Sequence, residues 1–139
     1  MTTKEWFMRV RRSDRRIDSL LQRKQEEWER VTSITANLSG DVVDGTKDPH
    51  KYDGYVALIR QIDEETDELY KAKEEVNAVI KQIPDIRYRD VLDKRYLGGK
   101  TWEQIAVEMH YTFRHVIELH GEALKAAETI VKERIHEEL

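Results

Sequence analysis

The side chains that could do chemistry gather near the C-terminus, between Lys100 and Glu118. Helical periodicity turns Arg114, His115 and Glu118 away from the apolar side of a predicted helix, so their polar groups face outward. An outward arginine can donate two hydrogen bonds to guanine, and a carboxylate can accept one from a cytosine amine. Lys100 and Thr101, at the start of the preceding predicted helix, could hold a phosphate through charge and backbone amides. These residues form a candidate surface for double-stranded DNA.

Two short helices must position these side chains. Thr101 and Gln104 fit a capping box, which predicts a helix start directly after a glycine pair. His110 stands where the tight turn between the helices needs a left-handed residue, a conformation that histidine tolerates better than most non-glycine residues. Thr112 can then cap the second helix. The inward side chains of the two helices are Trp102, Ile105, Ala106, Met109, Val116, Leu119, Ala123 and Leu124, and the small Ala106 allows a close helix crossing.

Structural roles compete with the DNA interpretation at each position. Arg114 could be a solvated helix arginine, and His115 is open to either interpretation. Glu118 is better explained as a solvated residue or as the i,i+4 partner of Arg114. His120 is expected to be a neighbour of the core. A zinc site built from His110, His115 and His120 is excluded because five-residue steps scatter the rings around a helix, and the chain has no cysteine.

Two longer helices are predicted upstream, over about Lys4 to Thr35 and about Tyr55 to Ile83, with a linker between residues 36 and 54 that is expected to be partly disordered. The second helix has a coiled-coil spacing, so its seam needs a partner. That partner is either the first helix, folded back as an antiparallel hairpin, or a second copy of the chain. Seam residue Lys73 either fixes the register or extends from the seam edge into solvent. The predicted inward residues are Trp6, Val10, Ile17, Leu20, Leu21, Trp28 and Val31 in the first helix, and Ile59, Ile62, Thr66, Leu69, Lys73, Val76, Ile80 and Ile83 in the second.

Pro84 ends the second long helix, because proline removes a backbone donor and restricts the residue before it. A short amphipathic helix is predicted over Ile86 to Leu97, with Val91, Leu92, Tyr96 and Leu97 inward, and the glycine pair ends it. The tryptophans Trp6, Trp28 and Trp102 are expected to be core anchors. We therefore expect an all-α protein, with a long helical hairpin over residues 1–83 and a helix-turn-helix domain over residues 84–139.

Charge is unevenly distributed along the 139 residues. Residues 1–35 carry nine basic and six acidic side chains, residues 36–85 carry six and twelve, and residues 86–139 carry nine and ten. A non-specific nucleic-acid binder usually has a strong basic excess, which this chain lacks. Its affinity for DNA through phosphate contacts alone should therefore be weak and sensitive to salt. Arg9, Arg12 and Arg16 share one helix side and could lie along DNA or an acidic partner, but Asp14 and Asp18 dilute them, and ordinary solvation is preferred.

The sequence contains no motif that favours an enzymatic function. The acidic run Asp63-Glu64-Glu65 falls on the outer face of a coiled-coil helix, where carboxylates are solvated, and no Ser-His-Asp grouping, phosphate loop or HExxH spacing occurs. No apolar stretch approaches the length of a membrane span, and Met1 to Val10 lacks a signal-peptide core. We expect a cytoplasmic protein that is not an enzyme, needs no metal or cofactor, and does not bind membranes.

The string RYRDVLDKRYLGGKTWEQIAVEMHYTFRHVIELHGEALKAAETI, which begins at Arg87, resembles region four of bacterial sigma factors. Together with RRSDRRIDSLL near the start and the central acidic helix, it makes nearly the whole chain similar to phage and prophage late-gene transcription regulators of the RinA/ArpU type. This resemblance implies DNA binding in a bacterial cytoplasm and activation of phage late genes. It places a recognition helix at Thr112 to Lys125, with its N-terminal end in the major groove. By the same match, Phe113, Arg114, Ile117 and Glu118 face bases, and Ile117 could touch a thymine methyl.

The leading expectation is a sequence-specific transcription regulator that docks at a promoter and uses its helical hairpin to form a homodimer or to contact RNA polymerase. Relatives tend to carry polar or basic residues where this chain has Phe113, Ile117 and Glu118. One alternative is a small-terminase-like DNA-packaging subunit, which also joins a helix-turn-helix to a helical oligomerisation region. Another is a module that binds polymerase or a sigma-factor partner without binding DNA, which Glu118 and the acidic total favour.

Overall fold

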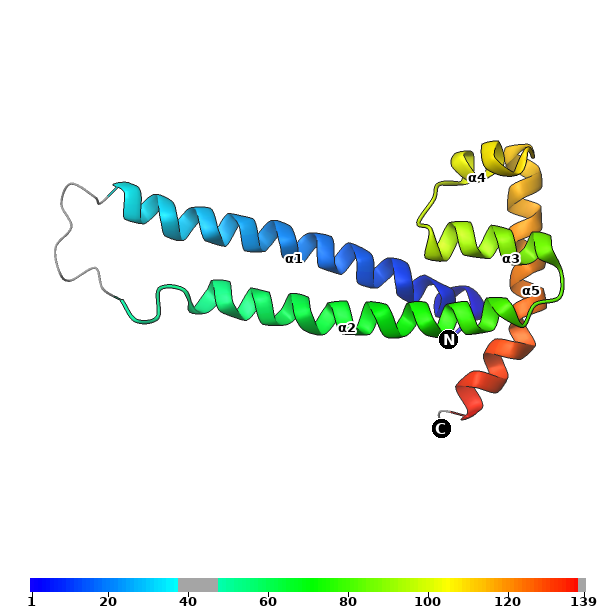
Figure 1. Cartoon of the computed structure of the whole chain (residues 1–139), viewed down its shortest axis with the longest axis horizontal. Coiled ribbons are helices and arrows are strands. Elements are labelled where there is room, and N and C mark those ends of the chain that lie inside the picture. The colour runs from blue at the N-terminus through cyan, green and yellow to red at the C-terminus, as the bar shows by residue number, and fades with distance from the viewer. Residues whose placement is uncertain (38–47, 138–139) are drawn as a thin grey trace. The chain divides into compact units, whose positions relative to one another are not determined.

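A computed structural model describes residues 1–37 and 48–137, which form helices joined by turns (Figure 1). No strand occurs in those two ranges, which confirms the predicted all-α class. Residues 38–47 of the predicted linker lie outside the described part of the chain. The elements in order are α1 (Thr3–Asn37), α2 (Asp53–Lys81), α3 (Ile86–Leu92), the π-helical segment η2 (Asp93–Leu97), α4 (Trp102–Met109) and α5 (Phe113–Glu137).

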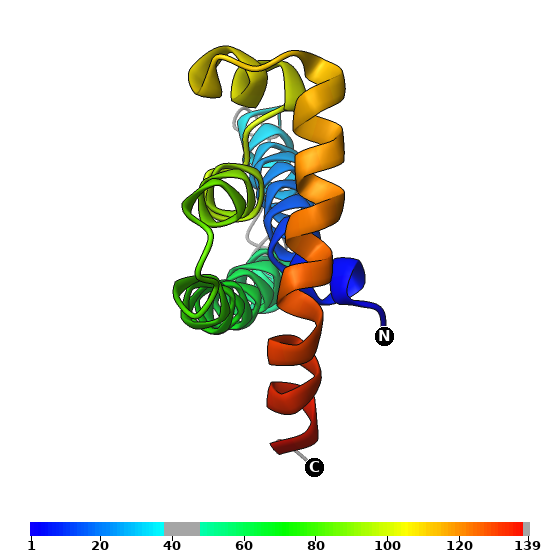
Figure 2. The ribbon, with the colours of Figure 1, turned by 90° about the vertical axis from the view of Figure 1, so that its right-hand side faces the viewer.

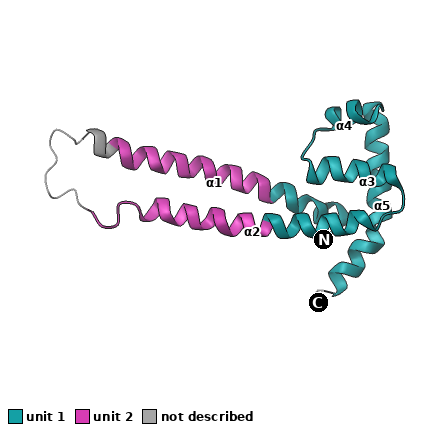
Figure 3. Ribbon diagram, in the orientation of Figure 1, with its two compact units in different colours: residues 1–12, 69–139 teal, residues 13–68 magenta. Residues whose placement is uncertain are grey.

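The chain divides into two compact units, coloured separately in Figure 3. Unit 1 combines Met1–Arg12 with Leu69–Leu139, and unit 2 is Ser13–Glu68. Each of α1 and α2 contributes one part of its length to each unit, because both helices continue through a unit boundary. The predicted division near residue 83 into a hairpin and a DNA-binding domain stays a prediction.

In unit 2, α1 and α2 contact each other along their lengths. Arg16 Nε lies 3.4 Å from Glu65 Oε2, and the ring centroids of Trp28 and Tyr55 are 5.2 Å apart. Because the residue number rises along one helix as it falls along the other, the two segments run in opposite directions. The buried side chains of this unit include Leu20, Val31 and Leu58.

Three of the predicted inward residues in unit 2 are instead exposed. Leu21 and Trp28 are each 42% exposed and Ile59 is 37% exposed, so their assignment to the inward stripes was wrong. Trp28 lies at the edge of the helix pair, where its ring meets two tyrosines rather than the seam. In α2 the neighbouring Leu58, only 8% exposed, is buried in place of Ile59, so the contact stripe is rotated by one residue at the start of this helix.

The core of unit 1 unites the start of α1, the end of α2 and the C-terminal helices. Trp6 and Phe7 are 2% and 0% exposed, and the Phe7 ring centroid lies 5.1 Å from that of Tyr96 in η2. Arg9 Nη2 lies 2.7 Å from Glu75 Oε2, which is an ion pair that is mostly shielded from water. The predicted seam residues Leu69, Val76, Ile80 and Ile83 are buried here.

The predicted helix over Ile86 to Leu97 is confirmed, with a π-helical end. The Asp85 side chain caps its start by accepting a hydrogen bond of 2.8 Å from the Arg87 amide. The Gly98 amide donates 2.8 Å to the Asp93 carbonyl, which closes the π turn. A Cβ on Gly98 would lie 2.8 Å from the Lys94 carbonyl oxygen, and Gly99 has φ +65°, so both positions of the glycine pair favour glycine.

Candidate nucleic-acid interface

The start of α4 is fixed by the predicted capping box. The Thr101 side-chain oxygen accepts a hydrogen bond of 3.2 Å from the Gln104 amide, while the Thr101 amide donates 2.9 Å to Gln104 Oε1. Two backbone donors that a helix start leaves unpaired are thereby satisfied. Helix α4 therefore begins where the sequence indicates, directly after the glycine pair and Lys100.

The turn between α4 and α5 occupies His110, Tyr111 and Thr112. His110 has φ 60° and ψ 38°, which confirms the predicted left-handed residue. The Tyr111 amide donates 3.0 Å to the Ala106 carbonyl, a bond typical of a left-handed helix ending. The Thr112 hydroxyl accepts 3.1 Å from the His115 amide and so caps α5, as predicted.

The apolar sides of the two helices are buried. Ile105 and Ala106 of α4 are 0% and 8% exposed, and α5 packs against both α3 and α4. Figure 2 shows α5 running past these helices within unit 1. The predicted end of the second helix at Lys125 was wrong, since α5 continues to Glu137. Further buried side chains at four-residue steps, Ala127 and Val131, stabilise this extension.

A buried polar pair lies on the inward side of α5. His120 is 7% exposed, and its Nε2 shares a hydrogen bond of 2.6 Å with the Tyr96 hydroxyl. The His120 ring also meets Trp102 edge to face, with centroids 4.6 Å apart. Burial, helped by the charges of Lys4 and Arg95, lowers the pKa of His120 to about 4. Burial likewise raises the pKa of Tyr96 to about 12. His120 is therefore a neutral structural residue, as expected.

The outward side of the first turns of α5 carries an ion pair beside an apolar pair. The Arg114 side chain is 90% exposed, and its Nε lies 3.3 Å from Glu118 Oε1 one turn later. This is the predicted i,i+4 partner. Phe113 and Ile117, also one turn apart, are 49% and 38% exposed. The exposed apolar pair and the ion-paired arginine together form a surface of mixed apolar and charged character at the start of α5.

His115 is also exposed, and its ring meets Tyr111 edge to face with centroids 4.4 Å apart. Tyr111 thus supports a predicted site residue from the turn, a contact that the sequence interpretation missed. The signal was present, because an aromatic residue four positions before a histidine at a helix start can reach the same side. Val107 on α4, 75% exposed, was likewise missed as an outward apolar residue.

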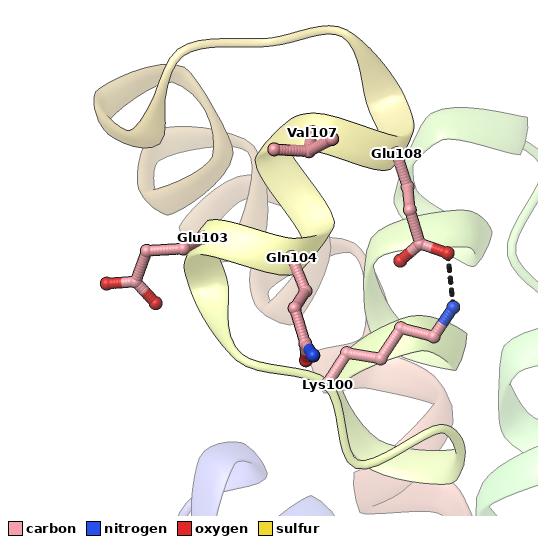
Figure 4. Close-up of a pocket in the computed structure, with 5 residues that line it drawn as sticks. All are labelled: Lys100, Glu103, Gln104, Val107 and Glu108. Carbon is pink, nitrogen blue, oxygen red and sulfur yellow. Dashed lines mark hydrogen bonds and ion pairs between the residues drawn. The ribbon is translucent and has the colours of Figure 1, made fainter.

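Lys100 and Thr101 form a separate group at the start of α4. Figure 4 shows the Lys100 side chain extending to the Glu108 carboxylate, while Glu103 points away. Lys94 Nζ lies 3.7 Å from the same carboxylate. The hydrogen bond from Lys100, with the charges of both lysines, lowers the pKa of Glu108. Lys100 would have to exchange this partner to hold a phosphate.

The predicted site therefore lies in two places. Six residues share the cap and first two turns of α5, namely Thr112, Phe113, Arg114, His115, Ile117 and Glu118. The other two, Lys100 and Thr101, lie at the start of α4, which packs against α5. All are exposed except Lys100, which is partly buried beside Glu108.

Within the described ranges, no helix is both long and apolar enough to cross a membrane. Comparisons with curated proteins and with solved structures return no match. Residues 30–128, more than two thirds of the chain, match a family described as a protein of unknown function, DUF1492. The matched segment ends beyond the turn and the first turns of α5, so it includes the whole candidate interface. The chain belongs to the DUF1492 family.

Proposed function

We propose that the protein is a sequence-specific DNA-binding transcription regulator in which α4, the His110 turn and α5 act as a helix-turn-helix. The N-terminal end of α5 would enter the major groove. The observation that carries this proposal is the position of Arg114. Its side chain is 90% exposed two residues after the capped turn, while Val116 and Leu119 hold the opposite side of the helix in the core.

Relative interaction strengths favour release of Arg114 to DNA. An exposed i,i+4 ion pair contributes about 0.3–0.5 kcal/mol. A bidentate contact from arginine to guanine discriminates by about 1–3 kcal/mol. The Arg114–Glu118 pair can therefore open when a guanine edge is presented. Ile117 and Phe113 could then contact thymine methyls.

The resemblance to sigma region four and to RinA/ArpU-type regulators supports a promoter as the target and phage late genes as the regulated set. In this proposal the ligand is double-stranded DNA in a bacterial cytoplasm, and RNA polymerase is a second partner. The α1–α2 pair acts as a helical hairpin that forms a homodimer. A dimer contacts two half-sites on DNA and so makes roughly twice as many phosphate contacts as a monomer, which compensates for the lack of a basic excess. No catalytic step is involved.

The test is selection of duplexes from a random library at defined salt with competitor DNA, followed by affinity measurements on the enriched sequence. Arg114→Ala should weaken binding by about 1–3 kcal/mol and relax specificity at one base pair. Lys132→Ala is the matched control. It removes one positive charge and one exposed i,i+4 ion pair, the 3.0 Å contact with Glu128, from the other end of the same helix.

Lys132→Ala should leave the affinity for the selected duplex within about twofold of the wild-type value, because Lys132 lies outside the part of α5 proposed to enter the groove. If no duplex is enriched, the DNA proposal is wrong, and the module that binds polymerase or a sigma-factor partner without DNA becomes the better explanation. A mass in solution of eight or more subunits would instead favour the small-terminase-like function. Equal losses for the two variants would show that only net charge matters, which contradicts sequence-specific recognition.

A further inference from the structure

Unit 2 exposes a group of large apolar side chains that its own core does not use. They lie on both helices of the unit, drawn in magenta in Figure 3. We call this group the unit 2 apolar face. Its members are Leu21 (42% exposed), Trp28 (42%), Tyr52 (44%), Val56 (49%) and Ile59 (37%). Contiguous exposed apolar surface of this kind usually marks an interaction site.

The five side chains form one surface. Tyr52, Val56 and Ile59 follow one another at four- and three-residue steps, so they share a stripe along the start of α2. Leu21 and Trp28 are seven residues apart, two turns along one side of α1. The ring centroids of Trp28 and Tyr52 are 6.3 Å apart, and this contact joins the two stripes. The surface therefore extends across both helices.

Both stripes end in carboxylates. Asp63 follows Ile59 by four residues and so continues the α2 stripe, and Asp14 precedes Leu21 by seven residues on α1. Among the described residues, neither aspartate has an ion-pair partner within 4.0 Å, whereas Glu65 and Asp53 are paired with Arg16 and His50. Residues 13–37 and 48–68 together carry seven basic and twelve acidic side chains.

We propose that the unit 2 apolar face docks an amphipathic helix of a second protein, with an apolar stripe that covers the five side chains and basic residues that reach the aspartate end. Docking of a helix by its apolar side is a common recognition mode, and buried Trp and Tyr often carry most of the binding energy. A second copy of the chain would bring like charge against like charge at this face, which disfavours association. The proposed homodimer therefore uses another surface of the α1–α2 pair. This inference does not depend on DNA binding.

The probe is a synthetic helical peptide of about three heptads, with leucine at the a and d positions and lysine flanking the last two turns. A partner peptide carries glutamate in place of each lysine. Binding to the full chain is followed by the anisotropy of a dye on the peptide. The lysine peptide should bind at least about tenfold more tightly than the glutamate peptide, because only it complements the aspartate end.

Variants of the chain test the face itself. Trp28→Ala should weaken the affinity for the lysine peptide at least about tenfold. Val56→Ser, a milder change that keeps the aromatic contact, should weaken it at least about threefold. Asp63→Lys should weaken binding at least about threefold. Glu68→Lys is the matched control, with the same charge change on the same helix but five residues away and off the stripe; it should change binding less than about twofold.

Three outcomes would overturn the proposal. Equal affinity for the two peptides, or equal losses for Asp63→Lys and Glu68→Lys, would show that the face does not select a basic helix. Unchanged binding by Trp28→Ala and Val56→Ser would place the peptide elsewhere. A dimer seen by sedimentation that Trp28→Ala and Val56→Ser both disperse would assign the face to a second copy of the chain.

Discussion

Replacement of His120 by glutamine should remove a defined part of the protein's acid sensitivity. In the folded chain, burial holds the pKa of His120 to about 4, whereas an unfolded histidine has a pKa near about 6.5. Between these two pKa values, the histidine is therefore protonated in the unfolded state and neutral in the folded state. Stability from this residue is complete above pH 6.5 and is lost as the pH falls toward 4.

The magnitude follows from those two values. Between pH 7 and pH 5 the unfolded histidine becomes almost fully protonated while the folded one stays neutral, which removes about 2 kcal/mol from the free energy of unfolding. Solvent screens this effect little, because His120 is only 7% exposed. Glutamine has no titrating group, yet its amide can still form a hydrogen bond with the Tyr96 hydroxyl.

Urea unfolding followed by circular dichroism at the two pH values gives the measurement. Between pH 7 and pH 5, the free energy of unfolding of the wild-type chain should fall by about 2 kcal/mol more than that of His120→Gln. Carboxylates that titrate in this range contribute equally to both proteins and cancel in the difference. His115→Gln, which removes an exposed histidine from the same helix, is the matched control for the substitution itself. The reasoning is refuted if wild type and His120→Gln show the same pH dependence.

Three further predictions concern the two-helix site. Ala106→Leu should lower the free energy of unfolding by about 1–3 kcal/mol through overpacking, whereas Val107→Leu on the exposed side should change it little; urea midpoints separate them. His110→Val should lower stability by about 1 kcal/mol more than His110→Gly, because a β-branched residue resists the left-handed conformation; equal midpoints would contradict this. Glu118→Gln should strengthen binding to the selected duplex by about fivefold, since it releases Arg114 and removes a charge that repels phosphate; a weaker affinity would instead make Glu118 a direct contact.

Local signals predicted the C-terminal structure well. The capping box at Thr101, the left-handed His110 and the Thr112 cap are each determined by residues within one helical turn, so the sequence contains what is needed to predict them. The outward orientation of Arg114 follows from the same periodicity. The site geometry could therefore be predicted, whereas its ligand is not determined by these local features.

Long-range packing was harder to predict. Phe7 is fully buried against Tyr96, a contact between residues almost ninety positions apart that no local pattern indicates. Trp28 and Ile59 were assigned inward because they match a three- and four-residue spacing, but neighbouring stripes on a long helix match it nearly as well. Which stripe faces the partner depends on the other helix. The extension of α5 beyond Lys125 was missed because that bound was taken from the sigma-factor resemblance, and the burial of Val131 that stabilises the extension depends on long-range packing.

The continuous length of α5 has a thermodynamic consequence. Its 25 residues extend about 37 Å, and side chains from Val116 to Val131 fix it along one side. The exposed first turns are therefore ordered before any ligand arrives, and they cannot rotate about the helix axis without disturbing that whole row. Association at this end should need little folding of the chain. Its heat-capacity change should then reflect only the surface that the ligand covers, without the large negative contribution of a segment that orders on binding.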